Sequence, residues 1–189
     1  VREDEYGGSI ENRSQFVSDI IKSVRENVSE NFIVGLRFSQ WKQHDFEAKL
    51  ASNPEELKTI LTSPVESGLD YLHSSMRRFW ESEFTGSKEN LAYWTKKITK
   101  IPTIGVGSVG LDSDFIDMTA PATPTSIDKA IDDITNDKYD LIAVGRALLS
   151  DHEWVLKMKE GRVNDVIPYT KDALPVSYTH LTLPTTVRV

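Results

Sequence analysis

The 189-residue sequence contains no cysteine, which excludes disulfide bonds, thiolate zinc sites and cysteine-ligated iron–sulfur clusters within it. No apolar run approaches the roughly 20 residues that cross a bilayer. Basic residues are in the minority, with 22 Lys and Arg against 29 Asp and Glu, and the net charge is −7. A protein that coats nucleic acid needs a basic surface. We therefore expect neither a nucleic-acid nor a membrane partner, and a cytoplasmic location is compatible with the composition.

Four short apolar or β-branched runs recur at similar spacing, with a period of some 35 residues, which is the length of a βαβ unit. Such runs are typical of strands buried on both faces of a parallel sheet. The predicted strands are Phe32–Phe38, Leu69–His73, Pro102–Gly107 and Leu141–Gly145.

Helical patterns lie between these runs. The stretch Ile10–Val28 carries an apolar stripe of Phe16, Val17, Ile20, Ile21, Val24 and Val28. Asn53 and Pro54 form a helix start, Ser87 is a candidate cap for the next helix, and Thr125 or Ser126 for the one after it. Arg146–Lys159 is also helix-like. Alternating strands and helices predict an α/β protein with a parallel sheet, either doubly wound or half of a (β/α)8 barrel.

The end of the chain follows neither pattern. Val176–Thr185 resembles the conceptual translation of a transposase sequencing adaptor. We therefore expect residues 1–174 to form a partial barrel and residues 175–189 to be a non-native tail. Together with a first residue that is not Met, this predicts a fragment of a longer protein.

Residues 2–13 read Arg-Glu-Asp-Glu-Tyr-Gly-Gly-Ser-Ile-Glu-Asn-Arg and precede an amphipathic helix. On physical grounds they are a turn followed by a capped helix start. The string also resembles the signature of the old yellow enzyme family, the FMN-dependent NAD(P)H:flavin oxidoreductases, with Gln15 as the departure. The resemblance extends from Arg2 to about Leu174 and implies the C-terminal half, about strands 5–8, of a (β/α)8 TIM barrel.

Arg37 stands near the end of the first predicted strand, where a cation is costly unless an anion meets it. A buried ion pair with a carboxylate and a bound anionic ligand are equally compatible with this placement. The resemblance favours the ligand, since it implies that Arg37 contacts the pyrimidine side of the flavin and stabilises its reduced, anionic form.

Glycine-rich turns follow the last two predicted strands. Gly107 and Ser108 belong to the first turn, and Gly145 and Arg146 to the second. Glycines at such turns more often relieve steric crowding of the backbone than bind a ligand. However, the loops after strands seven and eight of a barrel commonly form a phosphate site, where an arginine adds a planar charge. The resemblance assigns these four residues to the FMN phosphate.

Arg78 and Trp80 follow the second predicted strand and are substrate-side candidates, although a packed loop with a solvated arginine explains them slightly better. His44, His73 and His152 show no metal-ligand spacing, so we expect no metal site. His180 lies in the excluded tail.

The resemblance implies an enzyme that uses NADH or NADPH to reduce FMN, which then passes hydride to an activated alkene, an α,β-unsaturated small molecule such as an enone. The catalytic pair of the family, His with a second His or Asn, is expected upstream of this chain, so no catalytic residue is assigned here. Two alternatives stay open: a phosphate-binding barrel isomerase or aldolase, and an inactive half-barrel. Homo-oligomerisation is also left open.

Overall fold

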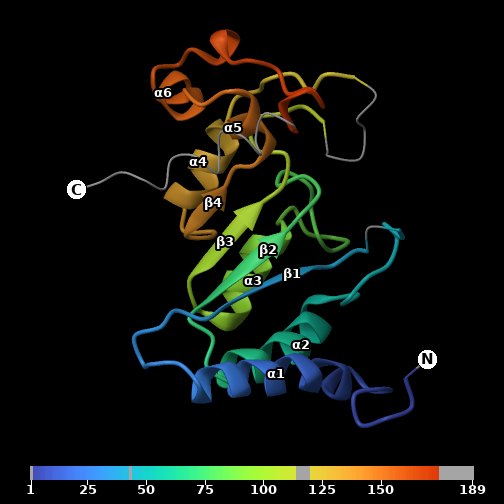
Figure 1. Cartoon of the computed structure of the whole chain (residues 1–189). Coiled ribbons are helices and arrows are strands. Elements are labelled where there is room, and N and C mark those ends of the chain that lie inside the picture. Colours follow the sequence, from blue (N-terminus) through green and yellow to red (C-terminus); the bar gives the residue numbers. More distant parts are fainter. Residues whose placement is uncertain (1, 43, 114–119, 175–189) are drawn as a thin grey trace.

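A computed structural model describes residues 2–42, 44–113 and 120–174 of the chain (Figure 1). The expected tail, residues 175–189, lies outside the described residues, so the predicted domain boundary stays a prediction. Helices and strands alternate along the chain, as the sequence predicts. The elements are α1 (Ile10–Glu26), β1 (Gly35–Ser39), α2 (Pro54–Glu66), β2 (Tyr71–Ser75), α3 (Leu91–Thr99), β3 (Thr103–Val106), α4 (Asp128–Thr135), β4 (Leu141–Ala143), α5 (Arg146–Ser150), α6 (Trp154–Lys159) and a 3-10 turn at Val163–Asp165.

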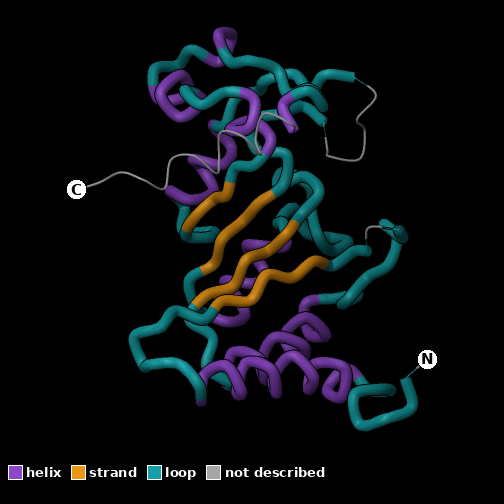
Figure 2. Tube along the Cα trace, in the orientation of Figure 1, coloured by secondary structure: helices purple, strands orange, loops and turns teal. Residues whose placement is uncertain are grey.

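The strands form one parallel sheet in the order β1-β2-β3-β4, so each strand pairs with the next along the chain (Figure 2). A doubly wound sheet reverses its strand order at a switch point, whereas a barrel adds strands in sequence. The observed order therefore decides between the two predicted architectures. The described residues form a four-stranded arc of a (β/α)8 barrel.

The two faces of this sheet differ in what covers them. On the helix-side face, Leu72 and Ser74 are fully buried, and Ser74 contacts Thr95 of α3. Adjacent strand residues point to opposite faces. The opposite face, called the open face below, carries one row of registered residues from the four strands. Its members are Arg37, His73, Ile104 and Leu141.

The open face corrects one expectation from the sequence, which was that the strands are buried on both sides. Leu141 is 59% exposed, and Arg37 and Gly35 are exposed as well. Apolar composition alone cannot tell whether the second face of a strand meets protein or solvent.

Helix starts follow from local hydrogen bonds, and two of them confirm the sequence reading. Ser9 accepts from the N–H of Asn12, and Asn53 accepts from Glu56 with Pro54 at the first helical position. The predicted cap Ser87 is wrong, because Asn90 caps α3 by accepting from Tyr93. The next helix also differs, since α4 begins after Ile127 with no side-chain cap, while Ser126 accepts from Asp128 within the turn before it.

Two further helical predictions need correction. The apolar stripe of α1 is only partly covered, since Ile21 is buried whereas Phe16 and Ile20 are nearly half exposed. The single helix predicted over Arg146–Lys159 is divided into α5 and α6. Asp151 causes the break, because its buried carboxylate accepts from Lys157 Nζ at 2.7 Å and from the N–H of Ile167 at 3.0 Å.

Candidate functional site

The carboxyl ends of the four strands meet at one edge of the sheet and carry the predicted site residues. Arg37 from β1, Gly107 and Ser108 after β3, and Gly145 and Arg146 after β4 all line one cavity of about 140 Å³. The structure therefore brings together the five residues that the sequence proposed for cofactor binding. The other lining residues are Ser75, Met76, Arg77, Val106, Val109, Leu111 and Ala143.

Backbone geometry at two glycines shapes this cavity. Gly107 has φ of +154°, and a Cβ there would lie 2.7 Å from the carbonyl oxygen of Met76. Only glycine permits so close an approach of the two loops. A Cβ at Gly145 would have nothing within 4 Å, so the backbone there borders open space. The β3–α4 loop is thus packed against Met76, the residue that follows β2, while the β4–α5 turn leaves room for a ligand.

Arg146 joins the last two loops of the sheet. Its Nη2 donates to Ser108 Oγ at 3.2 Å and to the carbonyl of Ser113 at 2.6 Å, and its guanidinium lies 5.4 Å from the centre of the Tyr169 ring. Ser108 Oγ in turn donates to the carbonyl of Arg77 at 2.9 Å. These contacts hold a planar, permanently charged group at the cavity wall, which is the chemistry that suits a phosphate.

Arg37 reaches the same cavity from the open face. Its Nη2 donates to Ser75 Oγ at 3.1 Å, and it forms no ion pair with a carboxylate among the described residues. The side chain is exposed, so the buried ion pair considered from the sequence is not what the structure shows. Two arginines from opposite ends of the sheet therefore line one cavity.

His73 lies next to Arg37 in the β1–β2 register. Burial, followed by the positive charge of Arg37, lowers the pKa of His73 below its usual value. Its Nε2 is buried and has no hydrogen-bond partner in the described parts of the chain. A neutral imidazole is the form that this environment favours.

A second cavity, of about 200 Å³, lies between the β1–α2 and β2–α3 loops. Its wall includes Trp41, Phe46, Arg77 and Arg78 together with several carboxylates. Arg78 Nη1 donates to Glu81 at 2.7 Å. The structure thus places Arg78 on a cavity wall, whereas Trp80 is 37% exposed and is not among the lining residues of either cavity.

The base of the β1–α2 loop is closed by Gln40, which is buried. Its side-chain amide accepts from the N–H of Ala51 at 2.8 Å and donates to the carbonyl of Ala51 at 3.0 Å. The same amide donates to the carboxylate of Glu83 in the β2–α3 loop. Lys49 Nζ lies 3.1 Å from the same carboxylate oxygen. Burial raises the pKa of Glu83, against the opposing effect of Lys49. Glu83, in the middle of the β2–α3 loop, therefore joins that loop to both ends of the β1–α2 loop.

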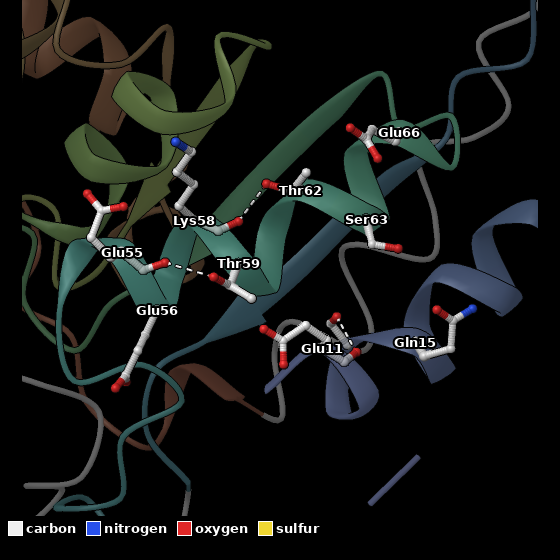
Figure 3. A pocket seen from close by; sticks show the side chains of 10 residues that line it. Glu11, Gln15, Glu55, Glu56, Lys58, Thr59, Thr62, Ser63 and Glu66 are labelled. Atoms are coloured by element: carbon white, nitrogen blue, oxygen red, sulfur yellow. Dashed lines mark hydrogen bonds between the residues drawn. The ribbon is translucent and has the colours of Figure 1, made fainter. Parts of the chain in front are cut away.

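A larger cavity, of about 600 Å³, lies elsewhere, in a groove between α1 and α2 (Figure 3). Four glutamates line it, and Figure 3 shows Glu55 and Glu56 at the start of α2 and Glu66 at its end. An acidic groove on the helical layer repels a phosphate. We therefore place the candidate site at the strand ends, where cations and glycine turns converge, in spite of the smaller volume.

Sequence reasoning did not select Ser75 or Arg77, although both line the two strand-end cavities. The sequence signal that identifies Ser75 is its position two residues beyond the predicted end of the second strand, at the edge where the other candidate residues lie. Among the described residues, no cluster of three or more His, Asp or Glu is arranged to hold a metal ion. No helix in those same ranges combines the length and apolar character needed to span a bilayer.

The chain matches known proteins over most of its length, both in a family model and in individual relatives. The family model described as "NADH:flavin oxidoreductase / NADH oxidase family" matches residues 1–165. The chain is 34% identical over 173 residues to a NADH oxidase of Thermoanaerobacter brockii, covering 87% of this chain and 24% of that protein. It is 28% identical over 186 residues to a cinnamate reductase of Clostridium sporogenes, covering 88% of this chain and 26% of that one.

Among solved structures, an old yellow enzyme homologue from Zymomonas mobilis superposes with a TM-score of 0.64 at 17% identity. That match covers 95% of this chain and 46% of the solved chain. At this identity the likeness concerns the fold, which is the barrel predicted above. The chain spans about a quarter of the two curated relatives and less than half of the solved structure.

Proposed function

Because the chain belongs to the NADH:flavin oxidoreductase / NADH oxidase family, we propose that it is the C-terminal half of a reductase of old yellow enzyme type that acts on activated alkenes such as enones. Family membership carries FMN and a reduced nicotinamide as cofactors. It also decides against the isomerase or aldolase considered from the sequence. The alkene substrate rests on the family resemblance and on the cinnamate reductase among the relatives.

One observation carries the proposal: residues from all four strands or from the loops that follow them, including Arg37 and Arg146, line a single cavity at the strand ends. In a barrel, this edge holds the catalytic and phosphate-binding groups. The donor set fits FMN, since Arg146 supplies a charge for a phosphate and the backbone at Gly145 borders open space. Arg37 supplies a second charge on the open face.

In this proposal each residue has a separate task. Arg146 holds the phosphate, and Ser108 keeps the Arg146 guanidinium oriented through its hydroxyl. Gly107 lets the loop pack closely on Met76, just after β2, and Arg37 stabilises negative charge near the sheet. FMN, when bound, supplies the hydride chemistry. Arg78 and Trp80 remain the predicted substrate-side residues, and the His and His-or-Asn pair is expected in the upstream half of the barrel.

The proposal is tested by titrating the 189-residue chain with FMN and with riboflavin, which lacks the phosphate, while flavin fluorescence is followed. A charge-assisted hydrogen bond contributes about 1.5–3 kcal/mol, so we expect FMN to bind at least about tenfold more tightly than riboflavin. Arg146→Gln should remove that preference and leave riboflavin binding unchanged. Equal affinities for the two flavins in the unchanged chain would contradict the phosphate site.

Arg162→Gln is the matched control, because it removes the same charge from a surface ion pair with Glu160. It should bind both flavins as the unchanged chain does. We further expect the 189-residue chain to bind FMN weakly and to lack alkene reduction, since half of the barrel is not in it. Robust NAD(P)H-driven enone reduction by this chain alone would overturn the half-barrel assignment.

A further inference from the structure

Arg37 lies in the middle of β1, yet its side chain lines the cavity at the strand ends. A contact with Ser75, the last residue of β2, accounts for this, because Arg37 Nη2 donates to Ser75 Oγ at 3.1 Å. We infer that Ser75 is a positioning residue: its hydroxyl holds the Arg37 guanidinium at the cavity and so strengthens the preference of the site for reduced over oxidised FMN. This inference rests on the role proposed above for Arg37.

The register of the two strands gives this contact its direction. Arg37 is the partner of His73 in the β1–β2 ladder, whereas Ser75 lies two residues further along β2. Residues two apart in a strand point to the same face and are separated by about 6.6 Å along it. The hydrogen bond therefore draws the guanidinium diagonally across the open face, toward the carboxyl ends of the strands.

The backbone of Ser75 is fixed by the strands on both sides of it. Ser75 is the register partner of Ser39 in β1 and of Val106 in β3. The next residue, Met76, is buried and donates its N–H to the carbonyl of Val106 at 2.9 Å. A side chain on a paired strand is held more precisely than one on a loop. The Ser75 hydroxyl therefore has a defined place in the wall of the cavity.

The chemistry of the partner matters because Arg37 is exposed. A long side chain in solvent occupies several rotamers, and ordering it when a ligand binds costs free energy. A carboxylate would order the guanidinium but would also offset its charge. A serine hydroxyl is neutral, so Ser75 orients Arg37 and leaves its positive charge available to an anion.

His73 offers a measure of where the Arg37 charge lies. It is the register partner of Arg37 and precedes Ser75 by two residues on the same face. Burial, and then the positive charge of Arg37, lowers the pKa of His73. Without the Ser75 hydroxyl, the guanidinium spreads into solvent, where its charge is screened from the imidazole. The position of Arg37 is therefore measurable in the chain without flavin.

The first test follows the pKa of His73 by NMR titration of the 189-residue chain without ligand. Ser75→Ala should raise this pKa, because the Arg37 charge is no longer held, and Ser75→Thr should restore it, because threonine keeps the hydroxyl. In an Arg37→Gln background, Ser75→Ala should have no further effect. A shift of the same size in both backgrounds, or no shift when Arg37 is present, would overturn the inference. Ser39→Ala is the matched control, since Ser39 is the register partner of Ser75, and it should leave this pKa unchanged.

The second test titrates the same variants with oxidised FMN and, without oxygen, with dithionite-reduced FMN. Ser75→Ala should weaken reduced FMN by about two- to tenfold, which is the cost of ordering one long side chain on binding. It should leave the affinity for oxidised FMN within about twofold, and Ser75→Thr should bind both forms as the unchanged chain does. Equal losses for the two forms in Ser75→Ala would overturn the inference.

Arg37→Gln separates this inference from the proposed function. It should lower the ratio of reduced to oxidised affinity at least as much as Ser75→Ala does. An unchanged ratio in Arg37→Gln would contradict the role proposed for Arg37 toward FMN. The His73 titration would still decide, without flavin, whether Ser75 holds Arg37 in place.

Discussion

The helix-side face and the open face of the sheet are built from alternate residues of the same strands, yet they differ in exposure and chemistry. Leu72 on the helix-side face is fully buried, whereas Leu141 on the open face is 59% exposed. The helix-side face is apolar with a small hydroxyl cluster, and the open face carries Arg37 and His73. One face therefore holds the sheet to its helices, and the other is available for the chemistry of a site.

The largest expected difference between the faces is in stability. Leu72→Ala should cost about 2–5 kcal/mol of unfolding free energy, because it opens a cavity in a packed core. Leu141→Ala should change it by less than about 0.5 kcal/mol, as an exposed substitution does. Urea unfolding followed by circular dichroism measures both. Equal costs would show that the open face is covered in solution, and the comparison would fail.

A smaller effect is expected at the buried hydroxyls. Ser74 Oγ donates to Thr95 Oγ1 at 3.0 Å, and both residues are fully buried. Ser74→Ala removes this hydrogen bond and should cost about 0.5–1.5 kcal/mol. Ser75→Ala, the next residue and the partner of the exposed Arg37, should cost less than about 0.5 kcal/mol in the same unfolding assay. Similar losses for the two variants would contradict the assignment of these neighbours to different faces.

The smallest effect is a pH dependence that belongs to the open face. Burial, and then the positive charge of Arg37, lowers the pKa of His73 below the usual 6.5 of a histidine, so the folded state binds fewer protons than the unfolded state just below that pH. Stability should therefore fall as the pH drops from about 6.5 toward the folded pKa. Urea midpoints across this range should show a shallower slope for His73→Gln. Unchanged slopes would mean that His73 is protonated equally in both states.

Periodicity predicted the alternation of helices and strands because each strand is a short apolar run between polar turns. The strand ends were placed less well. The sequence ended the second strand at His73, whereas β2 extends to Ser75. Arg77 lies two residues beyond the observed end of β2 and borders both cavities, whereas its neighbour Arg78, which the sequence selected, borders only the second.

Tertiary contacts explain the features that local patterns missed. The break between α5 and α6 depends on Asp151, which bonds Lys157 and a segment 16 residues away. No helical periodicity contains that information. By contrast, Ser108 and Arg146 lie just beyond β3 and β4 as the sequence predicts, because the carboxyl edge of a parallel sheet is fixed by the order of strands and loops. Arg37 was predicted at the end of its strand and lies in the middle of β1, although it lines the same cavity.

The closure of the β1–α2 loop at Gln40 has a consequence for the changes that the loop can tolerate. The two ends of this loop are held together at Gln40. Its side-chain amide bonds the backbone of Ala51, and its carbonyl accepts from the N–H of Leu50. We therefore expect insertions or substitutions within the loop to leave the position of the strands unchanged. The wall that this loop gives to the second cavity can therefore change without moving Ser108 and Arg146, the residues that we propose to bind the phosphate.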